Sequence, residues 1–182
     1  MSELSLNNID TIYRKYVNDL YSYALHLGFD REISKDAIHD VFYKICLDKS
    51  RLDKITNIRF YLLRALKNRL LDIHKQKRDI SEISVDTVQE ELPFTIHVTI
   101  EDTIIQSEED EKTRMRVESL LESLTDRQRE IIYLRYSQEC DYEEIAQLMN
   151  ITVPACRKLS HKAISKLKMS PYSVALLFLF LS

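Results

Sequence analysis

The stretch 141-DYEEIAQLMNITVPACRKLSHKAISKLK-168 changes its charge in the middle. Its first ten residues contain three acids and no base, whereas the residues after Asn150 contain five bases and no acid. Asp141 followed three positions later by Glu144 is a capping-box pattern, which predicts a helix that begins near Tyr142. Apolar residues at three-and-four spacing continue to Asn150, a residue type that often ends a helix in the left-handed conformation. We therefore predict a short helix that ends at Asn150.

A second helix is expected about three residues later. Thr152 is a good N-cap, and Pro154 is tolerated in the first turn because its missing N–H would be unpaired there anyway. The bases of this helix lie off its apolar stripe, which consists of Cys156, Leu159, Ala163, Ile164 and Leu167. Two short helices joined by so tight a turn, the second of them basic, predict a DNA-binding helix-turn-helix. Lys-rich helices are also common as plain solvated faces, so the remaining sequence has to decide.

The composition of the chain predicts an all-α fold. Its 182 residues include one Gly and three Pro, and they show long helical periodicities without marked strand runs. The chain has three cysteines, an odd number, and no C-x-x-C pair; they are Cys46, Cys140 and Cys156. We therefore expect all three thiols to be reduced and their side chains to be half-buried packing residues. No signal-peptide pattern opens the chain, and we expect a cytoplasmic protein.

The formal net charge of −3 conceals a segregation of charge along the chain. Residues 79–111 contain eleven acids and no Lys or Arg, whereas residues 1–78 carry +5 and residues 112–182 carry +3. Two basic lobes therefore flank an acidic connector. Basic patches on compact domains favour nucleic-acid binding, because each phosphate contact releases counterions.

The first lobe shows three helical runs, at residues 8–27, 31–47 and 57–78. The first two should pair antiparallel across Gly28. The third is the most basic, with seven bases against one acid, and Phe60 and Tyr61 lie at its start. Bases beside aromatic rings suit single-stranded nucleic acid, because the charges follow the backbone while the rings stack on unpaired bases. A core aromatic pair with a solvated face is the alternative.

In the second lobe, Thr125 with Gln128 three residues later is another capping box, ahead of a helix that should support the helix-turn-helix. Two apolar segments lie outside the helical runs. The segment 92-LPFTIHVTI-100 alternates with a period of two, so we expect extended chain that binds a groove on one of the lobes or on another molecule. The tail 171-PYSVALLFLFLS-182 is shorter than the roughly 17 to 25 residues of a membrane-spanning helix. We expect it to pack against the protein or a partner, with membrane contact as the alternative.

Several motifs, in order, resemble the extracytoplasmic-function (ECF) group of bacterial sigma factors, over nearly the whole chain up to about residue 170. They are the Tyr-rich opening 13-YRKYVNDLYSYA-24, the Asp-x-x-Gln-x-x-Phe run with His39 in place of Gln, the third-helix series Asn68, Asp72, Lys75, Lys77 and Arg78, the Arg-x-x-Ile pattern from Arg129, and the Tyr-Glu-Glu-Ile-Ala opening at Tyr142. The resemblance implies two small helical domains joined by an acidic linker. A three- to four-helix sigma region 2 domain would span residues 1–78, a flexible linker 79–112, a region 4 helix-turn-helix domain 113–170 and the apolar tail 171–182.

The resemblance also assigns site residues. The second helix would bind core RNA polymerase through Asp36, His39, Asp40 and Phe42, although some of these carboxylates could simply be solvated and Phe42 could belong to the core. The opened −10 strand would be held by Phe60, Tyr61, Arg64, Lys67, Asn68, Lys75, Lys77 and Arg78. The −35 element would be read by Thr152, Pro154, Ala155, Arg157, Lys158 and His161, with Lys162 and Lys166 on phosphates.

The implied partners are the clamp helices and flap of core RNA polymerase, promoter DNA and an anti-sigma factor, with no small-molecule substrate and no cofactor. No catalytic or metal-binding residue is expected, because the histidines are scattered and one Gly cannot build a phosphate loop. The linker acids either mimic nucleic acid in the polymerase channel or are a plain solvated linker. A conventional helix-turn-helix regulator is the alternative function, followed by a membrane-associated adaptor.

Overall fold

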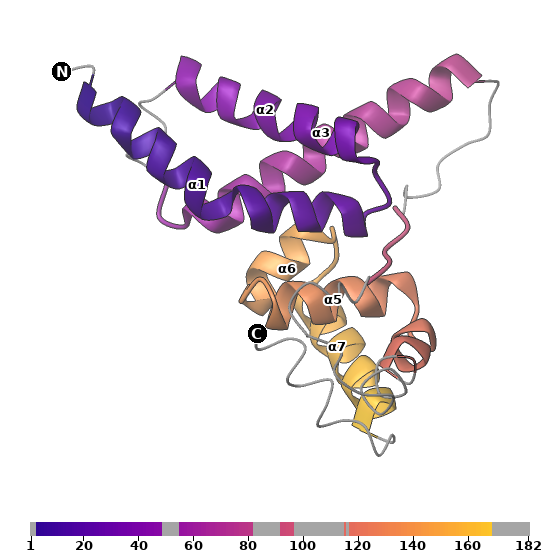
Figure 1. Cartoon of the computed structure of the whole chain (residues 1–182). Coiled ribbons are helices and arrows are strands. Elements are labelled where there is room, and N and C mark those ends of the chain that lie inside the picture. Colours follow the sequence, from indigo (N-terminus) through magenta and orange to yellow (C-terminus); the bar gives the residue numbers. More distant parts are fainter. Residues whose placement is uncertain (1–2, 49–54, 82–91, 97–114, 116, 169–182) are drawn as a thin grey trace, which may run out of the picture. The chain divides into compact units, whose positions relative to one another are not determined.

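The computed structural model describes residues 3–48, 55–81, 92–96, 115 and 117–168, with side chains described for Ile9 onward and up to Lys77 in the third helix. The chain divides into two compact units, Met1–Pro93 and Phe94–Ser182. Within the described residues every regular element is a helix, which confirms the all-α prediction (Figure 1). The boundary between the units falls inside the acidic connector.

The first unit consists of α1 (Glu3–His26), α2 (Arg31–Leu47) and α3 (Ile58–Ser81), and each of these helices packs on the other two. Its core is built from the apolar stripes of all three helices, including Leu20, Tyr23 and Ala24 of α1, Ala37, Ile38 and Val41 of α2, and Leu62, Leu63, Leu66 and Leu70 of α3. In Figure 1 the C-terminal part of α3 extends past α1 and α2.

The turn between α1 and α2 explains the only glycine of the chain. Gly28 has φ +82°, a left-handed conformation that costs a residue without a side chain little. Phe29 N donates to Ala24 O and Gly28 N donates to Leu25 O, which is the Schellman pattern. Asp30 then caps α2 by accepting from Ile33 N. The predicted antiparallel pair across Gly28 therefore forms.

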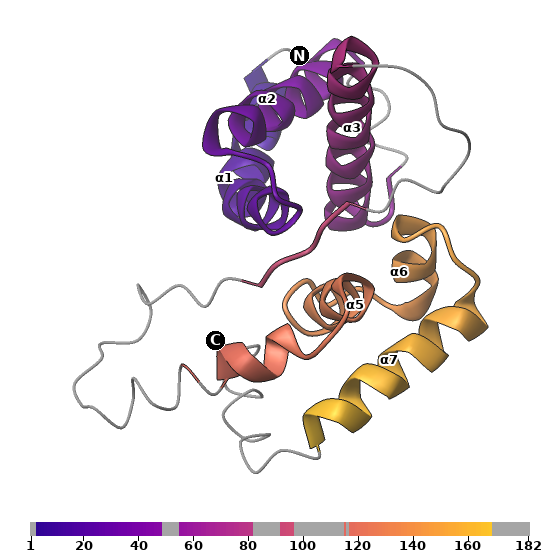
Figure 2. The same cartoon turned by 90° about the vertical axis from the view of Figure 1, so that its right-hand side faces the viewer.

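The second unit consists of a helical segment at residues 117–122, α5 (Asp126–Tyr136), α6 (Tyr142–Leu148) and α7 (Val153–Lys168). Both predicted capping boxes are present, at Thr125 with Gln128 and at Asp141 with Glu144. α5 is buried on most sides, including Ile131, Ile132 and Leu134, and α7 packs on both α5 and α6. α5 is thus the central support of the helix-turn-helix formed by α6 and α7 (Figure 2).

The turn of the helix-turn-helix depends on Asn150. The last helical residue of α6 is Leu148, two positions earlier than predicted, and Asn150 follows with φ +50°. Ile151 N donates to Ala146 O, so the turn closes as a Schellman motif with Asn in the position that Gly usually takes. Thr152 then caps α7 by accepting from Ala155 N through its hydroxyl.

The apolar segment of the connector packs on the protein itself. Residues 92–96 form no regular element, and the side chains of Leu92 and Phe94 are buried while those of Pro93 and Thr95 are exposed. The predicted alternation is therefore present. Of the two expected binding partners of this segment, the protein itself or another molecule, the structure shows the protein itself for residues 92–96. Residues 97–100 of this segment and the tail 171–182 lie outside the described residues.

The cysteines differ from their prediction at one position. All three are free thiols, and Cys140 and Cys156 are buried as packing residues. Cys46 is exposed on α2, so the expectation of a half-buried side chain is wrong there. Its neighbour Ile45 occupies the inward position in that turn, which leaves Cys46 on the solvent side.

Candidate nucleic-acid interfaces

The outer face of α7 presents most of the residues predicted to read duplex DNA. Cys156, Ser160 and Ala163 are buried, and Leu159, which was expected to face the core, is half-buried. The predicted DNA-facing side chains are all exposed, namely Thr152, Pro154, Ala155, Arg157, Lys158, His161, Lys162 and Lys166. A helix that exposes small residues in its first turns and cations beyond them can enter a major groove closely and contact base edges.

Two of these cations already have contacts within the second unit. Lys166 Nζ donates to Ser123 O at 3.0 Å, so in this structure it satisfies a carbonyl near the end of the 117–122 helical segment. Arg157 lies near the ring of Tyr142 and the carboxylate of Glu143.

The burial of Cys156 raises the pKa of its thiol from 9.0 to about 11, with the Glu143 carboxylate as a second cause. The thiol on the inner side of α7 is therefore protonated at neutral pH.

Six of the eight predicted strand-binding residues of α3 share one face of the helix. At roughly 100° per residue, Phe60, Tyr61, Arg64, Lys67, Asn68 and Lys75 fall within an arc of about 120°. The buried leucines occupy the opposite side. Arg64, Asn68 and Lys75 are exposed, while Phe60, Tyr61 and Lys67 are half-buried. The two rings thus lie at the start of a polar, cationic track.

Lys77 and Arg78 lie near the C-terminal end of α3, which ends at Ser81. Lys77 is exposed but lies about 100° away from Phe60, on the side opposite to Tyr61, so it is not part of the arc. The side chain of Arg78 lies outside the described residues. The start of α3 is fixed by Asn57, whose side chain accepts from Phe60 N at 3.1 Å, and by an ion pair between Arg59 and Asp19 of α1 at 2.8 Å.

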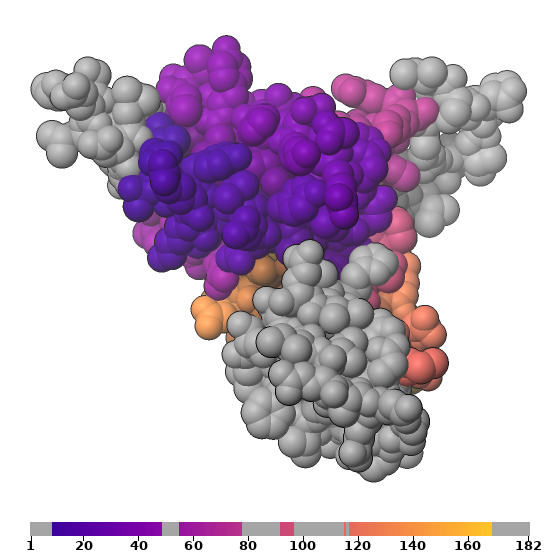
Figure 3. Space-filling view, viewed as in Figure 1, coloured from indigo at the N-terminus to yellow at the C-terminus, as the bar shows by residue number. Residues whose placement is uncertain are grey.

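On α2, a third outward face combines charged and apolar side chains. Asp36 and His39 are exposed, and Asp40 pairs with Arg69 of α3 at 2.7 Å. Tyr43 and Leu47 lie on the same side of the helix and are 64% and 69% exposed. Figure 3 shows one side of the first unit, where α1 and α2 form much of the surface. Sequence reasoning missed Tyr43 and Leu47, although both are apolar residues off the buried stripe of α2.

Phe42, predicted at the same interface, is a core residue in this structure. Its side chain is 6% exposed, and its ring meets that of Tyr13 edge-on at a centroid distance of 4.9 Å. The alternative that Phe42 belongs to the core is therefore the one observed. Phe42 thus packs α2 against α1, on the side of α2 that faces the core.

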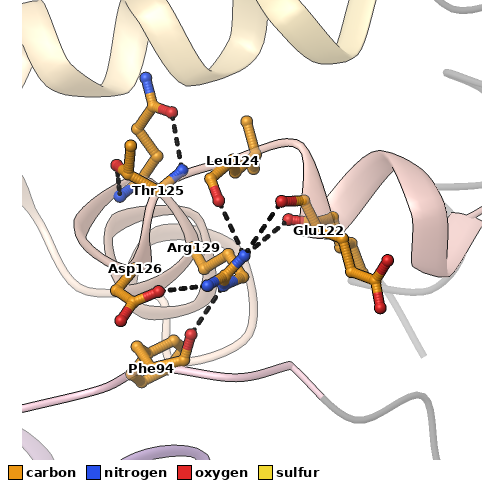
Figure 4. Close-up of polar contacts among 8 residues, drawn as sticks. Phe94, Glu122, Leu124, Thr125, Asp126 and Arg129 are labelled. Carbon is orange, nitrogen blue, oxygen red and sulfur yellow. Dashed lines mark hydrogen bonds and ion pairs between the residues drawn. The ribbon is translucent and has the colours of Figure 1, made fainter.

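Arg129 organises the base of the second unit (Figure 4). Its guanidinium donates to the carbonyls of Leu121 and Glu122, at the end of the 117–122 helical segment, and to that of Leu124 just after it, and it pairs with Asp126. On its other side, Nε donates to Phe94 O at 2.7 Å, and the Phe94 ring lies 5.5 Å from that of Tyr133. A cation that satisfies several carbonyls at a helix end has a structural role.

Comparison with known families matches both units. The family model described as Sigma-70 region 2 matches residues 12–80, and that described as Sigma-70, region 4 matches residues 114–167. The chain belongs to the sigma-70 family. This sigma factor carries regions 2 and 4, and its function is that of an alternative sigma factor, which directs core RNA polymerase to promoter DNA. A conventional helix-turn-helix regulator is not favoured, because it would not account for the region 2 match.

Two curated relatives of this sigma factor come from Bacillus subtilis (strain 168). The ECF RNA polymerase sigma factor SigM is 22% identical over 161 residues, covering 88% of this chain and 93% of SigM. The RNA polymerase sigma factor YlaC is 24% identical over 164 residues, covering 89% of this chain and 91% of YlaC. The ECF resemblance seen in the sequence is thereby confirmed over most of the chain.

A solved structure shares the fold of this sigma factor. It is the sigma factor RpoE in complex with the anti-sigma factor NepR from Bartonella quintana, with a TM-score of 0.58 at 15% identity. The match covers 87% of this chain and 93% of that one. Among the described residues, no helix is long and apolar enough to cross a membrane, and no group of acidic, His or Cys side chains could hold a metal ion.

Proposed function

We propose that the three outward faces divide the work of this sigma factor. The face of α2 binds core RNA polymerase, the arc of α3 holds the opened −10 strand, and the outer face of α7 reads the −35 element. The observation that carries the proposal is the arc of α3, where rings, cations and an amide lie together opposite the buried leucines. The corresponding domains would be residues 1–78 and 113–170, with the acidic linker between them.

The α2 face has the chemistry of a protein interface. Tyr43 and Leu47 expose apolar surface beside the acids Asp36 and Asp40. An exposed aromatic side chain next to charged ones is typical of the residues that contribute most to binding energy, because the ring adds contact area while the charges fix the orientation. The occupant proposed here is the clamp helices of core polymerase.

The α3 arc suits unpaired bases better than duplex. Phe60 and Tyr61 offer ring faces on which splayed bases can stack, and Arg64 and Lys75 can follow the phosphates. Strand opening would then be driven by capture of bases as they leave the duplex, so the proposal requires neither nucleotide hydrolysis nor a catalytic group of the protein. We place this activity in the cytoplasm, where core polymerase and the chromosome meet.

The α7 face fits the major groove of the −35 element. Arg157 and Lys158 lie in the second turn of the helix, close enough to its N-terminus to reach base edges, whereas Lys162 lies further along and suits phosphates.

Because RpoE from Bartonella quintana was solved with the anti-sigma factor NepR, we also propose an anti-sigma partner for this chain. Such a partner would cover the α2 or α7 face.

The experiment compares promoter opening by holoenzymes that carry wild-type chain, the double variant F60A/Y61A or the control Q76A. Gln76 is exposed on α3 but lies outside the arc. Permanganate reactivity of thymines near the start site reports unpaired bases. We expect F60A/Y61A to lower this reactivity by about 5- to 150-fold. Holoenzyme assembly, duplex binding and helix content should be retained, and Q76A should behave as wild type. Unchanged reactivity in F60A/Y61A would contradict the role of α3.

A further inference from the structure

Tyr142, the first residue of α6, lies where three helices of the second unit meet. The guanidinium carbon of Arg135 on α5 is 5.0 Å from the centroid of the Tyr142 ring, and that of Arg157 on α7 is 5.6 Å from it. The Tyr142 hydroxyl lies 3.4 Å from Oγ of the buried Ser160 on α7. The capping box of Asp141 and Glu144 on either side of Tyr142 fixes the backbone that carries the ring.

The two arginines are held differently. Arg135 is half-buried and donates to Cys140 O at 2.9 Å, so it is tied to the backbone of its own unit. Arg157 projects from the DNA-facing side of α7, with its side chain 63% exposed. Its only charged partner of the opposite sign within the described residues is Glu143, at 3.7 Å, whose side chain is 59% exposed. Arg157 is thus the cation that is both oriented by α6 and accessible to a ligand.

The contacts of Arg157 are weak enough to be exchanged for a base. A cation beside a ring and an exposed ion pair each contribute little in water. A bidentate contact between Arg and guanine discriminates against the wrong base by about 5- to 150-fold, so a matching base can displace the Glu143 contact. The ring of Tyr142 limits the rotamers of Arg157, which reduces the entropy lost when both guanidinium nitrogens engage one base edge.

Glu143 adds a repulsive element. Its carboxylate lies 3.7 Å from the Arg157 guanidinium, and its negative charge repels a DNA phosphate that approaches Arg157 from the same side. Without Glu143, nothing on this side of the Arg157 guanidinium would oppose a sequence-independent phosphate contact. The carboxylate therefore shifts the balance of Arg157 from phosphate binding towards base reading.

We infer that Tyr142 and Glu143 are positioning residues for Arg157 and thereby set the base preference at one position of the −35 element. Neither residue needs to touch the base itself. The inference deepens the proposed function of α7 and depends on it. The specificity of this sigma factor would accordingly be encoded on both helices of the helix-turn-helix.

The test uses holoenzyme assembled from the full chain and core polymerase, and a promoter library randomised across the −35 element. Bound sequences are counted for wild type and for the variants R157A, Y142L, Y142F and E143Q. The control is E122Q, which removes the same charge from an exposed side chain of the second unit. R157A identifies the position that Arg157 reads. At that position Y142L should lower the base preference about threefold to tenfold and E143Q about twofold to threefold.

The other variants separate positioning from simple stability. Y142F keeps the ring and should keep the preference, and E122Q should match wild type at every position. E143Q should in addition bind non-specific duplex more tightly than wild type. If thermal unfolding shows that Y142L does not fold, E143Q decides the question, because it changes one functional group of an exposed side chain.

The outcomes distinguish the inference from the function on which it rests. If wild-type holoenzyme shows no preference within the element, or R157A changes no position, both the role of α7 and the inference are overturned. If R157A abolishes a preference that Y142L and E143Q leave intact, the inference alone is overturned. Loss of preference spread evenly over the whole element in these variants would also overturn it, because that result indicates a general disturbance of α7.

Discussion

Arg129 donates from Nε to the main-chain carbonyl of Phe94 at 2.7 Å, although 35 positions separate the two residues. This bond and the 1% exposed Phe94 ring make a residue of the acidic connector part of the second unit. The second unit therefore includes a segment upstream of the region 4 match, which begins at residue 114.

Replacing Phe94 by Ala should destabilise the second unit by about 3 to 5 kcal/mol, because it removes a buried ring from the core around Tyr133. Hydrogen exchange of the α5 amides under native conditions measures this loss locally. The control M115A truncates a 59% exposed side chain and should stay within about 0.5 kcal/mol of wild type. Equal protection of α5 in F94A and wild type would show that Phe94 does not belong to this core.

The exposed pair on α2 predicts weaker polymerase binding in the double variant Y43A/L47A. Both side chains are mostly exposed, so their truncation should leave the fold intact. We expect the affinity for core polymerase to fall by about five- to thirtyfold, as for residues at the centre of an interface. Anisotropy of labelled chain titrated with core polymerase measures the affinity, with N18A on α1 as the control. An affinity equal to that of wild type would exclude this face as the docking surface.

The left-handed backbone at Asn150 predicts that two substitutions there change the free energy of unfolding differently. With φ at +50°, Gly should be tolerated or slightly stabilising, whereas a β-branched residue is strained. We expect N150V to lower the free energy of unfolding by about 1 to 2 kcal/mol and N150G to retain it. Thermal unfolding of the two variants side by side gives the comparison. Equal stability of N150V and N150G would mean that the left-handed turn is not formed.

The cysteines predict a simple labelling pattern. At pH 8 one thiol of the native chain, that of the exposed Cys46, should react rapidly with a disulfide reagent, and C46S should abolish this phase. Cys140 and Cys156 should react only after unfolding.

The free energy of unfolding should depend on pH through Cys156. Because burial raises the pKa of Cys156 to about 11, its contribution to stability is present below pH 9 and is lost as the pH rises through 11. The C156A variant should lack this component, and rapid reaction of two or three native thiols would contradict the burial.

Local signals predicted the local structure well. The capping boxes at Thr125 and Asp141 need only a side chain and an amide three residues apart, and both formed. Asn150 likewise marked its own turn, because few residue types tolerate the left-handed conformation. The helical periodicity of residues 57–78 predicted α3, and the polar arc opposite its buried leucines follows from the same periodicity.

Long-range contacts could not be predicted in the same way. The contact of Phe94 with Arg129 joins residues far apart in the chain, and the alternation of residues 92–96 indicated burial without naming the partner. The exposure of Tyr43 and Cys46 could not be predicted either, because an apolar side chain is buried only where another helix covers it. Phe42 is buried because Tyr13 of α1 packs against its ring.

Runoff transcription tests the central claim most directly: purified core polymerase, with and without this protein, on a pool of promoter fragments from its own genome. The account predicts new transcripts that start at defined sites only when the protein is present, and these sites would reveal the promoter elements. The absence of new transcripts from an active core, while the protein alone binds duplex DNA, would contradict its action as a sigma factor.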